Sequence, residues 1–392
     1  MKVERVSKKP LNIGLLGLVI NNGNMGCLAL TYSLIIIVEE LSHEFDGYEF
    51  RYFVFEDSPD PNKVREMCKW LNIDENRITS IPYKKGFAQL KDMNKCNLII
   101  DFTEGDSFSD IYGTKRFIKN SFYKILSIKS IAKLILGPQT YGPYINSINK
   151  YIAKYIIEKS DMVFSRDRYS IEYINEFVNK DVILSTDVAF KLPYVKNTHN
   201  RRDRKLIGFN ASKLLYFKEY NPSRIKLSLD FREFSYELIK YFSRNDWDVA
   251  LISHVAGDYI ANEELHKKYP SSILIDKFTN PIEAKKFISG LDALVSPRMH
   301  STIAAYSSGV SVVPLSYSRK FLGLYSEIGL TNIINMELMS LDDAVKNTIL
   351  YISSDNNRIN TASQNVINDR IEVFYNSLRQ IVLEIINGEE YS

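Results

Sequence analysis

The stretch that decides the fold is residues 291–323, LDALVSPRMHSTIAAYSSGVSVVPLSYSRKFLG. Residues 292–296 predict a short buried strand, and residues 301–308 predict a helix of small residues packed close on a sheet. Gly309 closes that helix, and residues 310–314 predict the next strand. A strand, a helix and a second strand in this order indicate one βαβ unit of a parallel sheet.

Polar residues occupy the junction between the first strand and the helix. Arg298, Met299 and His300 lie there, and Ser301 follows them. Open α/β sheets bind ligands where a strand's carboxyl end runs into a helix amino end, because free N–H groups and the helix dipole face an anion there. A guanidinium and an imidazole at that place predict an anion site that can also move a proton. A surface ion pair at Arg298 and a capping or core histidine at His300 are the alternative.

Two more side chains are expected near this junction, an imidazole and a second cation. His254 follows a strand predicted at 248–253, so it is expected at the same sheet edge as Arg298 and His300. Lys320 lies in the loop predicted after the strand at 310–314.

Composition limits the class of protein. The chain has 392 residues, of which 45% are hydrophobic and 25% charged, as in a globular protein of two domains. A net charge of +3, and 25 Tyr and 21 Phe spread along the chain, argue against nucleic acid as a partner. Cys27, Cys68 and Cys96 form no disulfide or zinc pattern, so neither a metal nor a cofactor is predicted.

The compartment follows from the absence of membrane signals in the sequence. No apolar run approaches the roughly 20 residues of a membrane span, and the charged N-terminus precedes no signal-peptide core. We therefore expect a cytoplasmic protein, and peripheral contact with the inner membrane face stays open.

Strand and helix patterns alternate on both sides of a polar, basic stretch at residues 193–205. This predicts an N-terminal Rossmann-like domain at 1–193, a C-terminal Rossmann-like domain at 205–360 and a C-terminal helical tail at 361–392. The expected fold class is α/β, with two doubly wound domains that face a cleft in a GT-B-like architecture.

Loops of the first half supply candidates for binding a second ligand. Residues 21–26, NNGNMG, join a predicted strand to a helix and bring Asn22 and Asn24, although a structural turn fits equally well. Residues 103–110, TEGDSFSD, follow a strand, so Asp106 and Asp110 can accept hydrogen bonds from sugar hydroxyls or act as a base. An Asp-rich turn with a helix cap is the alternative.

Two further positions follow predicted strands of the first half. Gln139 lies in GPQTYGP, a loop expected after a strand at 133–136. Arg166 follows a strand predicted at 162–165, where it either points into the cleft or pairs with Asp167.

Together these loops resemble the polysaccharide pyruvyl transferase family. The matching stretches run in the family's order through nearly the whole chain: NNGNMGCLAL, DFTEGDSFSDIYG, LGPQTYGP, SRD, STDVAF, IGFNAS, LISHVAGD and SPRMHSTIAAYSSGVSVVPLSYSRKFLG. The chain departs from the family at Glu104-Gly105, where two glycines are common, and at Ser253, where the family has proline before His254.

The resemblance implies a GT-B-like fold and an enzyme that moves pyruvate from phosphoenolpyruvate onto two hydroxyls of a sugar, giving a cyclic ketal and phosphate. Arg166 and Arg298 would clamp the donor, and His300 would transfer the proton. The implied sites comprise, on the donor side, Arg166, His254, Arg298, Met299, His300, Ser301 and Lys320, and, on the acceptor side, Asn22, Asn24, Asp106, Asp110 and Gln139.

The acceptor is expected to be a sugar or a lipid-linked oligosaccharide of a surface polysaccharide. Two other functions fit the same fold. One is a glycosyltransferase that uses a nucleotide-sugar donor, and the other is a non-catalytic glycan-binding relative.

Overall fold

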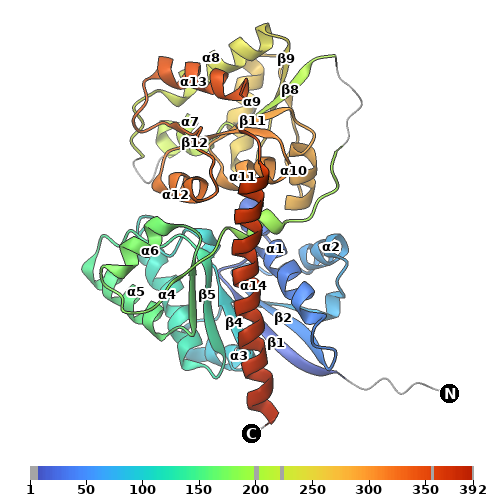
Figure 1. Cartoon of the computed structure of the whole chain (residues 1–392), viewed down its shortest axis with the longest axis vertical. Coiled ribbons are helices and arrows are strands. Elements are labelled where there is room, and N and C mark those ends of the chain that lie inside the picture. Colours follow the sequence, from blue (N-terminus) through green and yellow to red (C-terminus); the bar gives the residue numbers. More distant parts are fainter. Residues whose placement is uncertain (1–7, 198–202, 221–224, 355–356, 391–392) are drawn as a thin grey trace, which may run out of the picture. The chain divides into compact units, whose positions relative to one another are not determined.

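The computed structural model describes residues 8–197, 203–220, 225–354 and 357–390, which build two parallel sheets with their connecting helices (Figure 1). The chain divides into two compact units. Unit 1 runs up to Asn21, from Leu30 to Lys191 and from Asp369 onward. Unit 2 comprises Asn22–Ala29 and Leu192–Asn368.

Within its described residues, unit 1 holds a seven-stranded sheet of order β3-β2-β1-β4-β5-β6-β7. The strands are β1 (Lys9–Leu16), β2 (Tyr48–Glu56), β3 (Ile78–Pro82), β4 (Leu98–Asp101), β5 (Lys133–Gln139), β6 (Met162–Ser165) and β7 (Ile183–Leu184). The helices that begin in or belong to this half are α1 (Met25–Ser42), α2 (Pro61–Leu71), α3 (Leu90–Met93), α4 (Thr114–Lys129), α5 (Ser147–Lys159) and α6 (Arg168–Asn175).

Unit 2 repeats the same topology, with a six-stranded sheet of order β10-β9-β8-β11-β12-β13 in its described part. The strands are β8 (Lys205–Phe209), β9 (Trp247–Leu251), β10 (Ile273–Leu274), β11 (Ala293–Ser296), β12 (Ser311–Ser316) and β13 (Ile334–Asn335). The helices are α7 (Lys213–Tyr216), α8 (Phe231–Arg244), α9 (Tyr259–Lys268), α10 (Pro281–Ile288), α11 (Met299–Ser307), α12 (Arg319–Glu327) and α13 (Leu341–Ile352).

The strands read as apolar runs because parallel sheets are covered on both faces. All four residues of β4 and all four of β11 are buried. The C-terminal helix α14 (Thr361–Glu390) contributes to the core of unit 1, where Phe374 packs edge-on against Phe102 and Phe164.

Helix α1 corrects one sequence-based expectation. It has 18 residues and a mean hydropathy of 1.6, so by length and composition it is long and apolar enough to cross a membrane. In the structure 78% of this window is buried, which is the pattern of a core helix that is apolar all round.

Three predicted boundaries differ at positions that concern function. Strand β5 continues through Gln139, whereas a loop was expected from Gly137. Helix α11 begins at Met299 rather than Ser301, because the chain enters helical geometry directly after Arg298. Lys320 lies in the first turn of α12, not in a loop, and its side chain lies outside the described residues. The sequence patterns also predicted no helix at α3, α4, α7, α9 or α12.

Candidate functional site

The candidate site of unit 2 lies at the carboxyl edge of its sheet, beside the neighbouring strands β8 and β11. From this pair the chain continues in opposite directions, to β9 and β10 on one side and to β12 and β13 on the other. Such a switch point is where open α/β sheets bind ligands. Asn210 directly follows β8, and Arg298 lies two residues beyond the end of β11.

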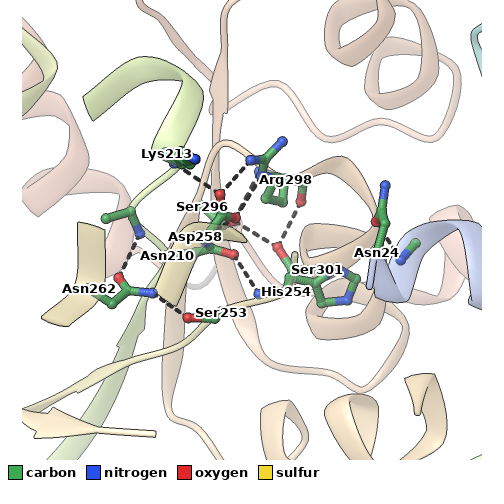
Figure 2. Close-up of polar contacts among 12 residues, drawn as sticks. Asn24, Asn210, Lys213, Ser253, His254, Asp258, Asn262, Ser296, Arg298 and Ser301 are labelled. Atoms are coloured by element: carbon green, nitrogen blue, oxygen red, sulfur yellow. Dashed lines mark hydrogen bonds and ion pairs between the residues drawn. The ribbon is translucent and has the colours of Figure 1, made fainter. Parts of the chain in front are cut away.

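Asp258 is the centre of the polar network at this edge (Figure 2). It is fully buried and accepts hydrogen bonds from Arg298 through Nε at 2.9 Å and Nη2 at 2.5 Å. The Asn210 side chain and the Lys213 backbone N–H donate to the same carboxylate, at 3.2 and 2.9 Å. A buried carboxylate needs such partners, and in return the two-pronged contact fixes the plane of the Arg298 guanidinium.

Helix α11 begins at the same place. Arg298 is its N-cap residue, and no side chain caps the helix. Two serine hydroxyl groups instead hold the backbone turn at Arg298. The Ser296 hydroxyl accepts from the Arg298 N–H at 3.0 Å, and the Ser301 hydroxyl donates to the Arg298 carbonyl at 2.7 Å. The positive end of the helix dipole therefore lies beside a guanidinium. Together they make this a suitable place for an anion.

His254 lies beside this network in a buried position. Its backbone N–H donates to the Asn210 side-chain oxygen at 3.3 Å. Burial lowers the pKa of His254 to about 3, and the nearby His300 and Arg298 add to the shift. The imidazole is therefore neutral near pH 7 and acts there as a polar, uncharged group.

The loop that carries Asn22 and Asn24 belongs to this same site rather than to unit 1. Asn24 pairs with Val255 in an antiparallel bridge, and the Met25 N–H donates to the His254 carbonyl at 3.0 Å. Both asparagines also shape the loop, because Asn22 accepts from the Asn24 N–H and Asn24 accepts from the N–H two residues later. Their predicted role on the acceptor side stays a prediction.

Gly26 lies directly against His300. A Cβ atom placed at Gly26 would lie 2.3 Å from His300 Nδ1 and 2.8 Å from its Cγ. No side chain fits into that distance, so only glycine permits this approach. The amino end of α1 thus packs directly against the His300 ring.

Arg166 is placed in unit 1, deep in the protein. Its side chain is 2% exposed, and its guanidinium donates to Asp187 at 2.6 Å and to Thr140 at 2.9 Å. Asp167, the partner considered from the sequence, instead caps α6 by accepting from Ser170 N–H. Arg166 as a donor ligand stays a prediction, and its visible partners give it a structural role inside unit 1.

The other unit 1 candidates are also engaged in local structure. Asp110 accepts from the backbone of Ile145 and Asn146 and from the Asn149 side chain. Burial acts to raise the pKa of Asp110, but these hydrogen bonds outweigh it and the pKa is lowered, so this carboxylate is a weak base. Asp106 accepts from the Tyr112 hydroxyl at 2.9 Å.

Gln139 is buried at the end of β5, where its amide donates weakly to Asp101.

The departure from the family at Glu104 has a visible consequence for the backbone. Thr103, Glu104 and Gly105 all have positive φ, at 43°, 57° and 89°, and Glu104 pairs with Arg116. A glycine at position 104 would adopt this backbone without the steric cost that a side chain brings.

Sequence reasoning missed Asn210 and Asp258, although both stand in stretches that matched the family. The signal for Asn210 was its place directly after the first strand of the second half, which is a switch-point position. Asp258 carried no comparable signal, because its partner Arg298 lies 40 residues away in the chain.

The contact between Gly26 and His300 generates a steric prediction. Gly26→Ala should displace the His300 ring and destabilise the protein by about 1 to 3 kcal/mol, as overpacking does. Thermal unfolding and the imidazole NMR signals of His300 measure the two effects. Gly47→Ala is the matched control, since nothing lies within 4 Å of a Cβ there. Equal melting temperatures and His300 signals in both variants would refute the contact.

Burial of neutral His254 generates a pH prediction. The unfolded chain binds a proton at this residue near pH 6.5, whereas the folded protein does so near pH 3. The contribution to stability is therefore complete above pH 6.5 and is lost as the pH falls towards 3, by about 3 kcal/mol at pH 4.5. Urea unfolding of the wild type and of His254→Asn from pH 7 to pH 4.5 tests this, with His254→Asn expected to show the flatter profile. Parallel profiles would contradict it.

Comparison with known proteins gives a family and a fold. The sequence model of the family "Polysaccharide pyruvyl transferase" matches residues 24–319. The amylovoran biosynthesis protein AmsJ of Erwinia amylovora is 22% identical over 267 residues, which are 61% of this chain and 61% of that protein. The chain thus spans about 61% of the length of this relative.

Solved structures share the fold at low sequence identity. The UDP-GlcNAc 2-epimerase of Methanocaldococcus jannaschii has a TM-score of 0.57 and 9% identity, covering 93% of this chain and 99% of its own. Anabaena HepE, solved in complex with UDP and glucose, has a TM-score of 0.55 and 11% identity, with coverages of 96% and 99%. These likenesses establish a GT-B-like α/β fold. Since the family match covers well over half of the sequence, the chain belongs to the polysaccharide pyruvyl transferase family.

Proposed function

We propose that this protein transfers the pyruvyl group of phosphoenolpyruvate onto two hydroxyls of a sugar in a surface polysaccharide or its lipid-linked precursor. One observation carries the proposal: Asp258 fixes the Arg298 guanidinium at the amino end of α11, the helix whose first turn contains His300. Family membership and the similarity to an amylovoran biosynthesis protein support a transferase of polysaccharide synthesis.

The donor fits the chemistry of this edge. Phosphoenolpyruvate carries a carboxylate and a phosphate, so it needs a cation and N–H donors that are already oriented. Arg298, held from one side by Asp258, and the backbone N–H groups of Met299 and His300 at the start of α11 supply them. His254, being neutral, contributes polarity without a second charge.

The reaction begins with proton transfer from the His300 imidazolium to the methylene carbon of phosphoenolpyruvate. The substituted carbon becomes an oxocarbenium-like centre, and a sugar hydroxyl adds to it and returns its proton to His300. The phosphate then departs with the electrons of its C–O bond. The second hydroxyl closes the ring and its proton leaves on the phosphate, so the products are the cyclic ketal and inorganic phosphate.

The proposal is tested by phosphate release from phosphoenolpyruvate in the presence of galactose- or mannosamine-containing acceptors. The acceptor should gain the mass of pyruvate less one water. His300→Ala should lower the rate by about 10² to 10⁴, since positioned acid–base groups contribute that much. His266→Ala, a histidine of α9 in the same unit, is the control. A rate for His300→Ala within tenfold of wild type would remove His300 from the mechanism.

Binding of the donor gives a separate prediction. Phosphoenolpyruvate should raise the melting temperature of the wild type, and Arg298→Lys should abolish most of that shift because an ammonium cannot reproduce a two-pronged contact. Arg232→Lys, which alters a surface arginine paired with Glu264, should keep the shift. Stabilisation by UDP but not by phosphoenolpyruvate would instead indicate a nucleotide-sugar enzyme.

A further inference from the structure

Unit 1 carries exposed lysine and apolar side chains that do not contribute to its core. We define the basic layer as residues 84–95 together with α4 and α5. It contains twelve Lys and Arg residues but two acidic residues, Asp92 and Glu158, although the net charge of the whole chain is +3. Lys124 is buried against Asp101, and five others pair with carboxylates, namely Lys84, Lys95, Arg116, Lys119 and Lys154. The layer still keeps an excess of positive charge, whereas the rest of the chain is net acidic.

The segments of the basic layer are contiguous. Helix α4 packs against α5 on one side and against α3 and the short turn Gly86–Gln89 on the other. Because β4, β5 and β6 follow one another in the same direction through the sheet, right-handed crossovers place α4 and α5 on the same face. Their outward sides consequently point the same way (Figure 1).

Large apolar side chains are exposed among these charges. Along α5, Ile148 is 69% and Tyr151 72% exposed, and Ile145 just before the helix is 79% exposed. Tyr155 and Lys159 continue the same stripe, since positions 148, 151, 155 and 159 share one helical face. This face is opposite the buried one, so the helix is apolar on both sides.

A second exposed apolar group lies across α4. Phe87 is 68% exposed and its ring contacts Phe122 of α4 edge-on at 6.2 Å, while Ile118 of α4 is 49% exposed. Lys115 and Lys129 of α4 and Lys159 of α5 are exposed and have no carboxylate partner among the described residues. Their charges therefore face solvent.

We propose that the basic layer of unit 1 docks on an anionic lipid bilayer. Aliphatic and tyrosine side chains between lysines are what an interfacial surface needs, because the apolar groups enter the headgroup boundary and the lysines attract anionic lipids. A second copy of this chain fits poorly, because two such layers repel each other. Nucleic acid fits poorly as well, because the isoleucines offer no stacking face. This inference does not depend on the proposed reaction.

Vesicle binding by the full chain tests the proposal. The protein should sediment with phosphatidylglycerol-containing vesicles and not with phosphatidylcholine alone, and salt should weaken the binding. The double variant Ile148→Glu/Tyr151→Glu should lose binding. The double variant Lys115→Glu/Lys159→Glu should weaken it by at least about fivefold for each lysine. All four positions are exposed, and circular dichroism with thermal melting confirms that the variants are folded.

Matched changes in unit 2 provide the controls. Leu350→Glu and Lys346→Glu alter exposed residues of α13 and should leave vesicle binding unchanged. Equal binding to neutral and anionic vesicles, or equal losses in the α13 variants, would overturn the proposal. So would a concentration-dependent dimer broken by Ile148→Glu/Tyr151→Glu without vesicle binding. Salt-sensitive binding to DNA that Ile148→Glu/Tyr151→Glu leaves intact, with no binding to vesicles, would overturn it too.

Discussion

The ion pair between Asp258 and Arg298 is the constraint on which the candidate site depends. A carboxylate buried to this degree is tolerated only when its oxygens are paired, and here a guanidinium, an amide and a backbone N–H converge on it. The pair joins the ends of β8 and β11 to the turn before α9. It therefore fixes the switch point of the sheet and the start of α11 at the same time.

The same site depends on a segment from the beginning of the chain. Residues Asn22–Ala29 belong to unit 2, and their backbone pairs with the loop that carries His254. Gly26 leaves room for the imidazole of His300, so a glycine that looks like an ordinary loop residue is a steric requirement of the site. The donor side of the protein thus draws on residues nearly 275 positions apart.

Charges in unit 1 fall into two physical groups. Buried ones are paired internally: Arg166 with Asp187, and Lys124 with Asp101. These pairs lie at the carboxyl edge of the first sheet. Their attraction offsets the desolvation free energy of placing a charge in the interior. By contrast, Lys115, Lys129 and Lys159 of the basic layer are exposed and have no carboxylate partner among the described residues. These charges contribute nothing to the core and leave the layer available for an external surface.

The sequence alone determined the two-unit α/β fold, because apolar runs of strand length alternating with helical patterns permit few other solutions. It also determined that Arg298, His254 and His300 share one sheet edge, since the ends of parallel strands meet there. Tertiary structure decided the rest. It made Asp258 the partner of Arg298, placed Asn22 and Asn24 in unit 2, and engaged Asp110 in hydrogen bonds with Ile145, Asn146 and Asn149. Periodicity reports which face of an element is buried, but partners distant in the chain are chosen only when the elements pack.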